Sequence, residues 1–220
     1  MNSGCVVDIL DAIRQRRAIR RFQSRPVATE ALRRLLDAAI WAPSAMNGQP
    51  WRFVIVTDEA LIARMAEQCR CWILDNSAAF PEAERLAPMM RDPDFHIFHH
   101  APALVVIAAP LGVRWGMEGC TLAAANVMLA ATALGLGTCW VGMAEGWLNS
   151  SAGRATLHLP ANAHVVAPIA VGYPQGEPEP VARHRPAVTW IGPGEPPIVE
   201  AGESPPYQPG PGLFGGLIHH

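Results

Sequence analysis

Residues 119–142 read GCTLAAANVMLAATALGLGTCWVG and carry no charged side chain. An uncharged run of about 20 residues is long enough to cross a bilayer. This run, however, is rich in Ala, Gly and Thr, contains Asn126, and is interrupted at Gly135-Leu136-Gly137. Because paired glycines break a helix, we predict a buried helix over residues 119–134 and a buried strand over residues 137–143. The small side chains of the helix would let another backbone pack closely against it.

Apolar patterns on both sides of this stretch predict the other elements. Residues 51–56 alternate in character, as a strand does, whereas residues 103–109 and 165–172 are apolar runs typical of strands buried on both faces. Strands that alternate with helices indicate one α/β or α+β domain with a central sheet. Four further helices are predicted. The first has an apolar face of Val6, Ile9, Leu10 and Ile13. The second begins at the cap Thr29 and ends at Pro43, and its core residues are Leu32, Leu35, Leu36, Ala39 and Ile40; the third covers residues 58–73, and a short one lies within residues 145–158.

Composition excludes several classes of protein. The chain has 220 residues, half of them hydrophobic and 16% charged, which is typical of a globular domain rather than a disordered one. A net charge of −2 gives no global basic field for nucleic acid. The N-terminal residues lack the basic segment of a signal peptide. The five cysteines are odd in number and show no zinc spacing, so we expect reduced thiols in a cytoplasmic protein without a metal.

Two segments differ from the rest in composition. Residues 76–100 mix prolines with short apolar groups, and we predict that they form a substrate lid of short helices and loops. From Pro174 onward, eleven of the last 47 residues are proline, which excludes long helices and central strands. We therefore expect one domain over residues 1–190, with an extended C-terminal arm and a Pro/Gly-rich tail over residues 191–220.

An arginine cluster follows the first predicted helix. All 17 basic residues of the chain are arginine, and six of them, Arg14, Arg16, Arg17, Arg20, Arg21 and Arg25, lie within twelve positions. Such a cluster can be a solvated surface, but guanidinium forks are also well suited to bind a phosphate. The sequence leaves both possibilities open.

Two further motifs are candidates for ligand contacts. Ser44, Asn47 and Gln49 lie between Pro43 and Pro50, either as a surface turn or as a polar loop whose amides bind the edge of a ring. The glycines of residues 135–142 allow a backbone to approach a ligand closely, although they do not match the Gly-x-Gly-x-x-Gly of a dinucleotide-binding helix.

Taken together, these motifs resemble those of the nitroreductase family. Its members combine an Arg-Arg-Ser-x-Arg-x-Phe motif, a Pro-Ser-x-x-Asn-x-Gln-Pro-Trp loop, a Gly-Leu-Gly-x-x-Trp-x-Gly strand, and a Gly-Tyr-Pro segment followed by a basic pair. The chain has the counterparts in the same order, at residues 16–22, 43–51, 135–142 and 172–174, followed by Arg183 and Arg185. Ala18 replaces the serine of the first motif, which removes a hydroxyl contact worth only about 1 kcal/mol.

The resemblance implies a homodimer with FMN at the subunit interface and a mostly antiparallel sheet of four to five strands flanked by helices. It also implies the cofactor contacts. Arg16, with Arg183 and Arg185, would bind the phosphate, and Arg20 would lie near the pyrimidine edge of the flavin. Ser44, Asn47 and Gln49 would come from the other subunit, and Pro43, in the same loop, would also contact the cofactor. Arg17 and Ala18 belong to the first motif, and Val141 and Gly142 would place backbone against the flavin ring.

The expected activity is the reduction of nitroaromatics, quinones or similar electron-poor molecules by NADH or NADPH, with flavin N5 rather than a protein side chain carrying the reaction. Two alternatives remain: another flavin reaction on the same fold, namely flavin destruction, reductive dehalogenation or heterocycle oxidation, or a flavin-binding protein without activity. His96, His99 and His100 form a further cluster, in which His96 and His100 would lie one helical turn apart. Since no third ligand accompanies that pair, we expect no metal there.

Overall fold

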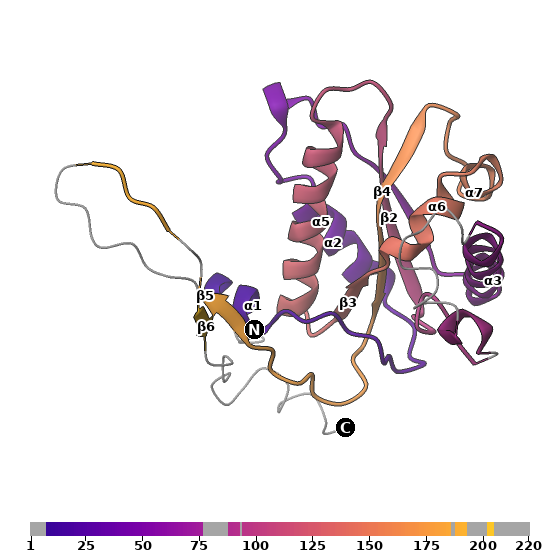
Figure 1. The fold of residues 1–220 in the computed structure, drawn as a ribbon, viewed down its shortest axis with the longest axis horizontal. Coiled ribbons are helices and arrows are strands. Elements are labelled where there is room, and N and C mark those ends of the chain that lie inside the picture. Colours follow the sequence, from indigo (N-terminus) through magenta and orange to yellow (C-terminus); the bar gives the residue numbers. More distant parts are fainter. Residues whose placement is uncertain (1–7, 77–87, 93, 186–187, 193–201, 205–220) are drawn as a thin grey trace.

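The computed structural model describes residues 8–76, 88–92, 94–185, 188–192 and 202–204. Its centre is a four-stranded antiparallel sheet in the order β1 (Arg52–Val56), β2 (Ala103–Pro110), β4 (Ala163–Gly172) and β3 (Gly137–Trp140). Figure 1 shows α2 (Thr29–Ala39) and α5 (Gly116–Ala133) on one face of the sheet. The other face carries α3 (Glu59–Asp75), α6 (Glu145–Leu148) and α7 (Ser151–Thr156). This three-layer α+β arrangement confirms the predicted fold class.

Strand β2 is buried on both faces, as its continuous apolar sequence predicts. Leu104, Val106 and Ala108 face the core on the α3 side. Ala103, Val105 and Ile107 face the core on the α2 and α5 side. Because successive side chains of a strand point to opposite faces, one apolar run supplies both cores.

Helix α5 is the buried helix predicted from the uncharged stretch. It ends before Gly135, whose φ of +69° is a conformation that glycine adopts easily. Its buried side chains are small, so α2 packs closely enough for the Asn126 amide to donate to the Ala38 carbonyl oxygen at 3.0 Å. Within the described ranges, neither α5 nor any other helix is long and apolar enough to cross a membrane.

Several details differ from the sequence-based expectation. Ala28, not Thr29, is the N-cap of α2, and it makes no side-chain capping bond. The predicted helix of residues 145–158 is two helices, α6 and α7. Ile9, Leu10 and Ile13 of α1 (Ile9–Gln15) are 59%, 54% and 51% exposed, so the described residues leave the apolar side of this helix uncovered. Val6 of the same predicted face lies outside the described residues.

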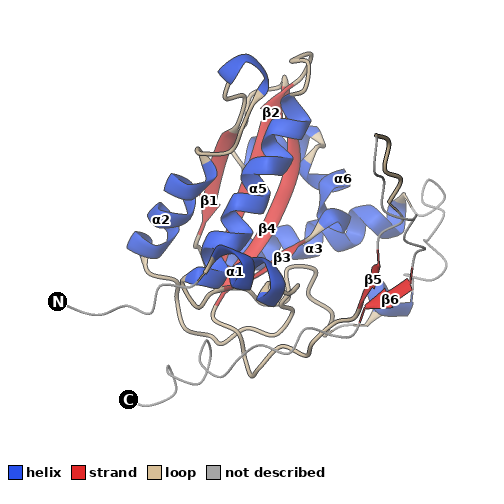
Figure 2. Cartoon of the chain, turned by 90° about the vertical axis from the view of Figure 1, so that its left-hand side faces the viewer, coloured by secondary structure: helices blue, strands red, loops and turns tan. Residues whose placement is uncertain are grey.

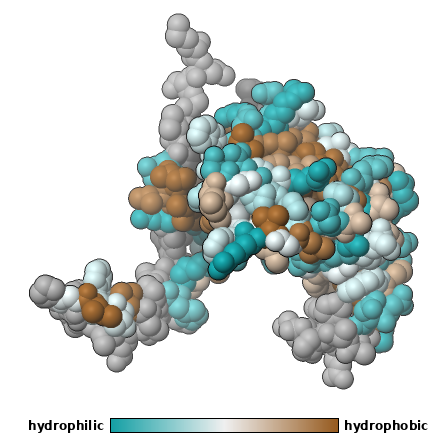
Figure 3. Space-filling model, turned by 90° about the horizontal axis from the view of Figure 1, so that it is seen from above, coloured by the Kyte–Doolittle hydropathy of each residue, from teal (hydrophilic) through white to brown (hydrophobic). Residues whose placement is uncertain are grey.

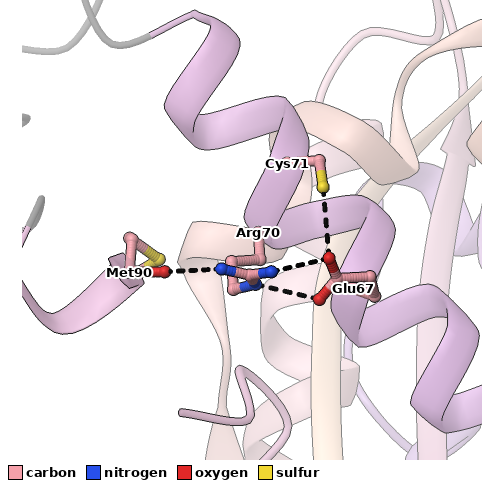
Figure 4. Close-up of polar contacts among 4 residues, drawn as sticks. All are labelled: Glu67, Arg70, Cys71 and Met90. Atoms are coloured by element: carbon pink, nitrogen blue, oxygen red, sulfur yellow. Dashed lines mark hydrogen bonds and ion pairs between the residues drawn. The ribbon is translucent and has the colours of Figure 1, made fainter. Parts of the chain in front are cut away.

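A polar cluster joins α3 to the short helical turn of residues 88–91 (Figure 4). Arg70 donates to both carboxylate oxygens of Glu67, at 2.9 and 2.7 Å, and to the carbonyl oxygen of Met90 at 3.0 Å. The Cys71 thiol donates to the same carboxylate at 3.4 Å. The guanidinium of Arg70, followed by the Cys71 thiol, lowers the pKa of Glu67. Residues 77–87 and residue 93 of the predicted lid lie outside the described part of the chain.

After β4 the chain crosses the end of the sheet and leads away from it (Figures 1 and 2). It forms a small ribbon in which β5 (Arg183–Arg185) pairs with β6 (Gly202–Ser204). The predicted tail, residues 191–220, lies largely outside the described residues. The described cysteines, Cys69, Cys71, Cys120 and Cys139, form no disulfide, as expected, and Cys5 is not among them.

Candidate functional site

Residues 16–22, here called the arginine-rich segment, run along the free edge of β3. Ala18 forms a parallel bridge with Thr138, and the Ile19 amide donates to the Thr138 carbonyl oxygen at 2.9 Å. The side chain of Ile19 fills the space above Gly137, where an added Cβ would lie 2.6 Å from Ile19 Cγ1. The absence of a side chain at Gly137 thus lets this segment, rather than a ligand, approach the strand. The sequence motif predicted the close approach but not what makes it.

This docking brings arginines from distant parts of the chain together. Burial lowers the pKa of Arg17, and the nearby charges of Arg183 and Arg16 lower it further. Burial raises the pKa of the Cys139 thiol in β3, while Arg20 and Arg16 oppose that shift. Arg183 thus lies close enough to Arg17 for the two charges to interact.

Within the described part of the chain, none of Arg16, Arg17, Arg20 and Arg183 forms an ion pair with a carboxylate. Repulsion among cations that no protein anion offsets favours the binding of an external anion. The donor set therefore fits the phosphate of a nucleotide-like cofactor.

The guanidinium of Arg17 is held by backbone carbonyl oxygens. It donates to the carbonyl oxygens of Arg14 and Arg16, at 2.5 and 2.9 Å, and to that of Glu179 at 3.3 Å. The bond to Glu179 ties the arginine-rich segment to the chain that follows β4. Arg183 donates to the nearby carbonyl oxygens of Val181 and Ala182, and Arg185 is the last residue of β5.

The polar loop of residues 43–50 contains the 3₁₀ turn η1 (Ala45–Asn47) and is strained. Met46, Asn47 and Gln49 have φ values of +52°, +54° and +45°, which are uncommon for residues other than glycine. Ser44 Oγ accepts from the Gln49 amide at 3.0 Å, and the Gln49 side chain donates to Asn47 Oδ1 at 3.2 Å. Strain of this kind occurs most often at functional sites.

Beside this loop lies a cavity of about 390 Å³. It is lined by Pro43, Ser44, Ala45, Trp115, Glu118, Gly119 and Leu122. Figure 3 views the molecule from the end that carries η1, where apolar side chains interrupt the polar surface.

The loop and the arginine-rich segment lie at opposite ends of α5 (Figures 1 and 2). Pro50 packs over Gly119, near the start of the helix, where an added Cβ would be 3.2 Å from its Cγ. Arg17 and Ile19 line a crevice with Thr132, near the end of the helix. Thr132 lies thirteen positions after Gly119 in this helix, or about 20 Å at 1.5 Å per residue. Within one chain, the two predicted halves of the site do not meet.

The backbone after β3 is open on one side. The Val141 amide donates to the Pro168 carbonyl oxygen at 2.8 Å, and the Val141 side chain is buried. A Cβ added to Gly142 would have no atom within 4 Å. Gly142 therefore has room for a flat ligand, unlike Gly137.

The histidines lie in a turn, in which His96 and His100 are in contact. The His100 amide donates to His96 Nδ1 at 3.2 Å, and the two ring centroids are 4.2 Å apart. Burial, followed by the charges of His100 and His99, lowers the pKa of His96 to about 4. No group of three potential metal ligands occurs among the described residues. The sequence did not indicate that the charge of Arg20 acts on His99: burial lowers the pKa of His99, and Arg20 lowers it further.

Comparison with known proteins decides the family. The sequence profile of the nitroreductase family matches residues 13–173, well over half of the chain. The chain belongs to the nitroreductase family. Among curated relatives, a putative NADH dehydrogenase/NAD(P)H nitroreductase from Archaeoglobus fulgidus is 30% identical over 77% of this chain and 87% of its own length.

A second relative of this nitroreductase-family chain has a different activity in its name. The 5,6-dimethylbenzimidazole synthase of Rhodospirillum rubrum is 32% identical over 77% of this chain and 84% of its own length. Among solved structures, an FMN-bound nitroreductase from Bacteroides fragilis superposes with a TM-score of 0.70 at 24% identity, covering 88% of this chain and 100% of that one. The superposition confirms the fold.

Proposed function

We propose that the protein is an FMN-dependent oxidoreductase that uses NADH or NADPH to reduce nitroaromatics, quinones or similar electron-poor small molecules. The observation that carries the proposal is the convergence of Arg16, Arg17 and Arg183, which have no carboxylate partner within the described ranges. When bound, FMN supplies the chemistry of accepting and donating hydride. The protein supplies binding, orientation and electrostatics.

In this proposal the arginines have separate tasks. Arg16 and Arg183, with Arg185 two residues further along β5, bind the phosphate, while Arg17 holds the chain after β4 in place through its contact with the Glu179 carbonyl oxygen. Arg20 would lie near the pyrimidine edge of bound FMN, where its positive charge would favour the reduced form of the cofactor. Ala18 contributes only its backbone, which pairs with Thr138. Val141 and Gly142 present backbone to the ring at the open side of β3.

We infer that a second copy of the chain completes the site with Pro43, Ser44, Asn47 and Gln49. The separation of about 20 Å along α5 supports this inference, because one chain cannot bring the loop to its own arginines. Uncovered apolar surface supports it as well: Ile9, Leu10 and Ile13 of α1, and Met117 and Leu122 of α5, are exposed. A homodimer would cover such a surface.

The test is the affinity for FMN, measured by quenching of flavin fluorescence. Replacing Arg16 and Arg20 together by Ala should weaken binding by at least roughly a hundredfold, since each charged hydrogen bond is worth about 1.5–3 kcal/mol. The matched control replaces Arg33 and Arg34, two exposed arginines of α2, by Ala and should bind FMN as the wild type does. Full retention of FMN by the Arg16/Arg20 variant would contradict the proposed site.

The second candidate function is another flavin reaction on the same fold, and it is favoured by the Rhodospirillum rubrum relative, which is named a synthase and not a nitroreductase. The two candidates differ in their use of nicotinamide. Anaerobic addition of NADH or NADPH should bleach the flavin absorbance if the protein is a reductase. A flavin that neither nucleotide bleaches would favour the second candidate or a binding protein without activity.

A further inference from the structure

The end of the arginine-rich segment, with the residues just after it, pairs with the chain that leaves β4. The Gln23 amide donates to the Tyr173 carbonyl oxygen at 2.9 Å. The Gln175 amide donates to the Arg21 carbonyl oxygen, also at 2.9 Å. Two reciprocal bonds of this kind fix which residue lies opposite which in an antiparallel pair. We call the pairing of residues 21–25 with residues 172–175 the clasp.

The residue types of the clasp suit this register. Phe22 and Pro174 form the antiparallel bridge between the two bonds, at a position where neither amide donates across the pair. Proline has no amide hydrogen, so it loses no bond there. Gly172 leaves room for Phe22, whose Cδ1 would lie 2.8 Å from an added Cβ. A shift of the pairing by one residue would bring Pro174 into a bonded position and cost a hydrogen bond.

Two side-chain contacts close the clasp. Gln23 Nε2 donates to the Pro174 carbonyl oxygen at 2.9 Å. The guanidinium carbon of Arg25 lies 4.1 Å from the centroid of the Tyr173 ring, which is the geometry of a cation–π stack. Arg25 belongs to the arginine cluster that the sequence left open between a solvated surface and a phosphate site. In the structure, its charged group lies on an aromatic ring of the chain itself.

The clasp leads directly to the arginines of the candidate site. Arg17 donates to the Glu179 carbonyl oxygen at 3.3 Å, and these two residues lie four positions beyond the clasp on either chain, so the contact keeps its register. Arg183 follows four residues after Glu179. A slip of one residue would move an extended chain by about 3.3 Å. That is longer than a charged hydrogen bond, so Arg183 and Arg16 would no longer reach one phosphate together.

We propose that the clasp positions the arginines from the two parts of the chain for the phosphate of FMN, with Gln23, Arg25 and Tyr173 as its positioning residues. This proposal rests on the proposed function. Arg25 acts through the Tyr173 ring and not on the phosphate. When the clasp opens, Arg16 and Arg183 keep their charges but lose the spacing that one phosphate requires. The affinity for the phosphate group then decreases, while contacts to the flavin ring remain.

The first test measures the Kd values for FMN and for riboflavin, which lacks the phosphate, by quenching of flavin fluorescence. Gln23→Pro removes both bonds of Gln23 to the other chain. It should raise the Kd for FMN at least about tenfold, as expected for two lost hydrogen bonds, and leave that for riboflavin unchanged. Ser24→Pro is the matched control, because the Ser24 amide forms no hydrogen bond within the described residues. Equal ratios of the two Kd values in both variants would overturn the proposal.

The second test concerns the stack and leaves the backbone intact, so it holds even where Gln23→Pro does not fold. Arg25→Met and Tyr173→Leu should raise the Kd for FMN by the same factor, about two- to fivefold, and the double variant should lose no more. Tyr173→Phe keeps the ring and should bind FMN as the wild type does. Arg114→Met, which removes a stack of the same 4.1 Å on Trp115, should leave the ratio of the two Kd values unchanged. A clearly larger loss in Arg25→Met than in Tyr173→Leu would show that Arg25 contacts the phosphate itself, and would overturn its assignment to the clasp.

The outcomes also separate this inference from the proposed function. A wild-type protein that binds no FMN would end both. If the Arg16/Arg20 variant loses FMN while Gln23→Pro and Tyr173→Leu bind it as the wild type does, the flavin site stands and only the role of the clasp is wrong.

Discussion

At the scale of single residues, two glycines of one motif have opposite surroundings. Gly137 is covered by Ile19, and an added Cβ would lie 2.6 Å from Cγ1 of that side chain. Gly137→Ala should therefore lower the free energy of unfolding of the FMN-free protein by about 1–3 kcal/mol, the usual cost of overpacking. Because Ile19 must move, the arginine-rich segment moves with it, and FMN affinity should decrease as well. Urea unfolding and flavin fluorescence measure the two effects.

Gly142 is the matched control for stability, since its added Cβ meets no atom within 4 Å. Gly142→Ala should change the free energy of unfolding by less than about 0.5 kcal/mol, as is usual for open surface positions. It should still weaken FMN binding, because the methyl group projects into the space proposed for the flavin. The proposed difference between the two glycines is wrong if Gly137→Ala is as stable as the wild type, or if Gly142→Ala is less stable than Gly137→Ala.

At the scale of elements, the histidine turn makes the stability of the fold depend on pH. The pKa of His96 is lowered from 6.5 to about 4 in the folded state, so between these values the unfolded chain binds a proton that the folded one does not. The free energy of unfolding should therefore fall as the pH is lowered from 6.5 through 4. Since the ring is only half-buried, solvent screening reduces the expected loss to about 1–2 kcal/mol.

His96→Asn isolates this contribution, because an amide oxygen can replace Nδ1 as the acceptor for the His100 amide without titrating. The variant should lose less stability between pH 6.5 and pH 4 than the wild type in urea unfolding, whereas the exposed-site variant His158→Asn should keep the wild-type dependence. An unchanged slope in His96→Asn would show that other groups cause the acid sensitivity.

At the scale of the whole molecule, the two halves of the proposed site lie at opposite ends of α5, so the dimer is open to a complementation experiment. One variant carries Arg16→Ala and Arg20→Ala; the other carries Asn47→Gly and Gln49→Gly, which remove the amides but tolerate the positive φ. Neither should bind FMN at a concentration that saturates the wild type. After exchange of subunits, each mixed dimer has one intact site, so roughly one site in four should bind FMN again.

In the control, the Arg16/Arg20 variant is taken through the same subunit exchange by itself, which should restore no FMN binding. Mass measurement by light scattering establishes in the same samples that dimers are present. If mixed dimers form and bind no FMN, the loop and the arginines do not share a site across the interface.

Most of the helices and strands could be predicted from the sequence, because they depend on interactions between residues that are close together in the chain. The apolar run at residues 103–109 required a strand buried on both faces, and Gly135 separated α5 from β3, because burial patterns and backbone preferences act over a few neighbouring residues. The arginine motif, the polar loop and the glycine strand were recognisable for the same reason, each being a short run of residues.

Only the tertiary structure decided how these runs meet. The contact of Ile19 with Gly137, the approach of Arg183 to Arg17, and the position of His99 near Arg20 all join residues far apart in the chain. The exposure of Ile9, Leu10 and Ile13 depends likewise on what the rest of the chain leaves uncovered. Periodicity specifies which face of an element is apolar, but packing in three dimensions determines what that face contacts, and thus where the cations of the candidate site gather.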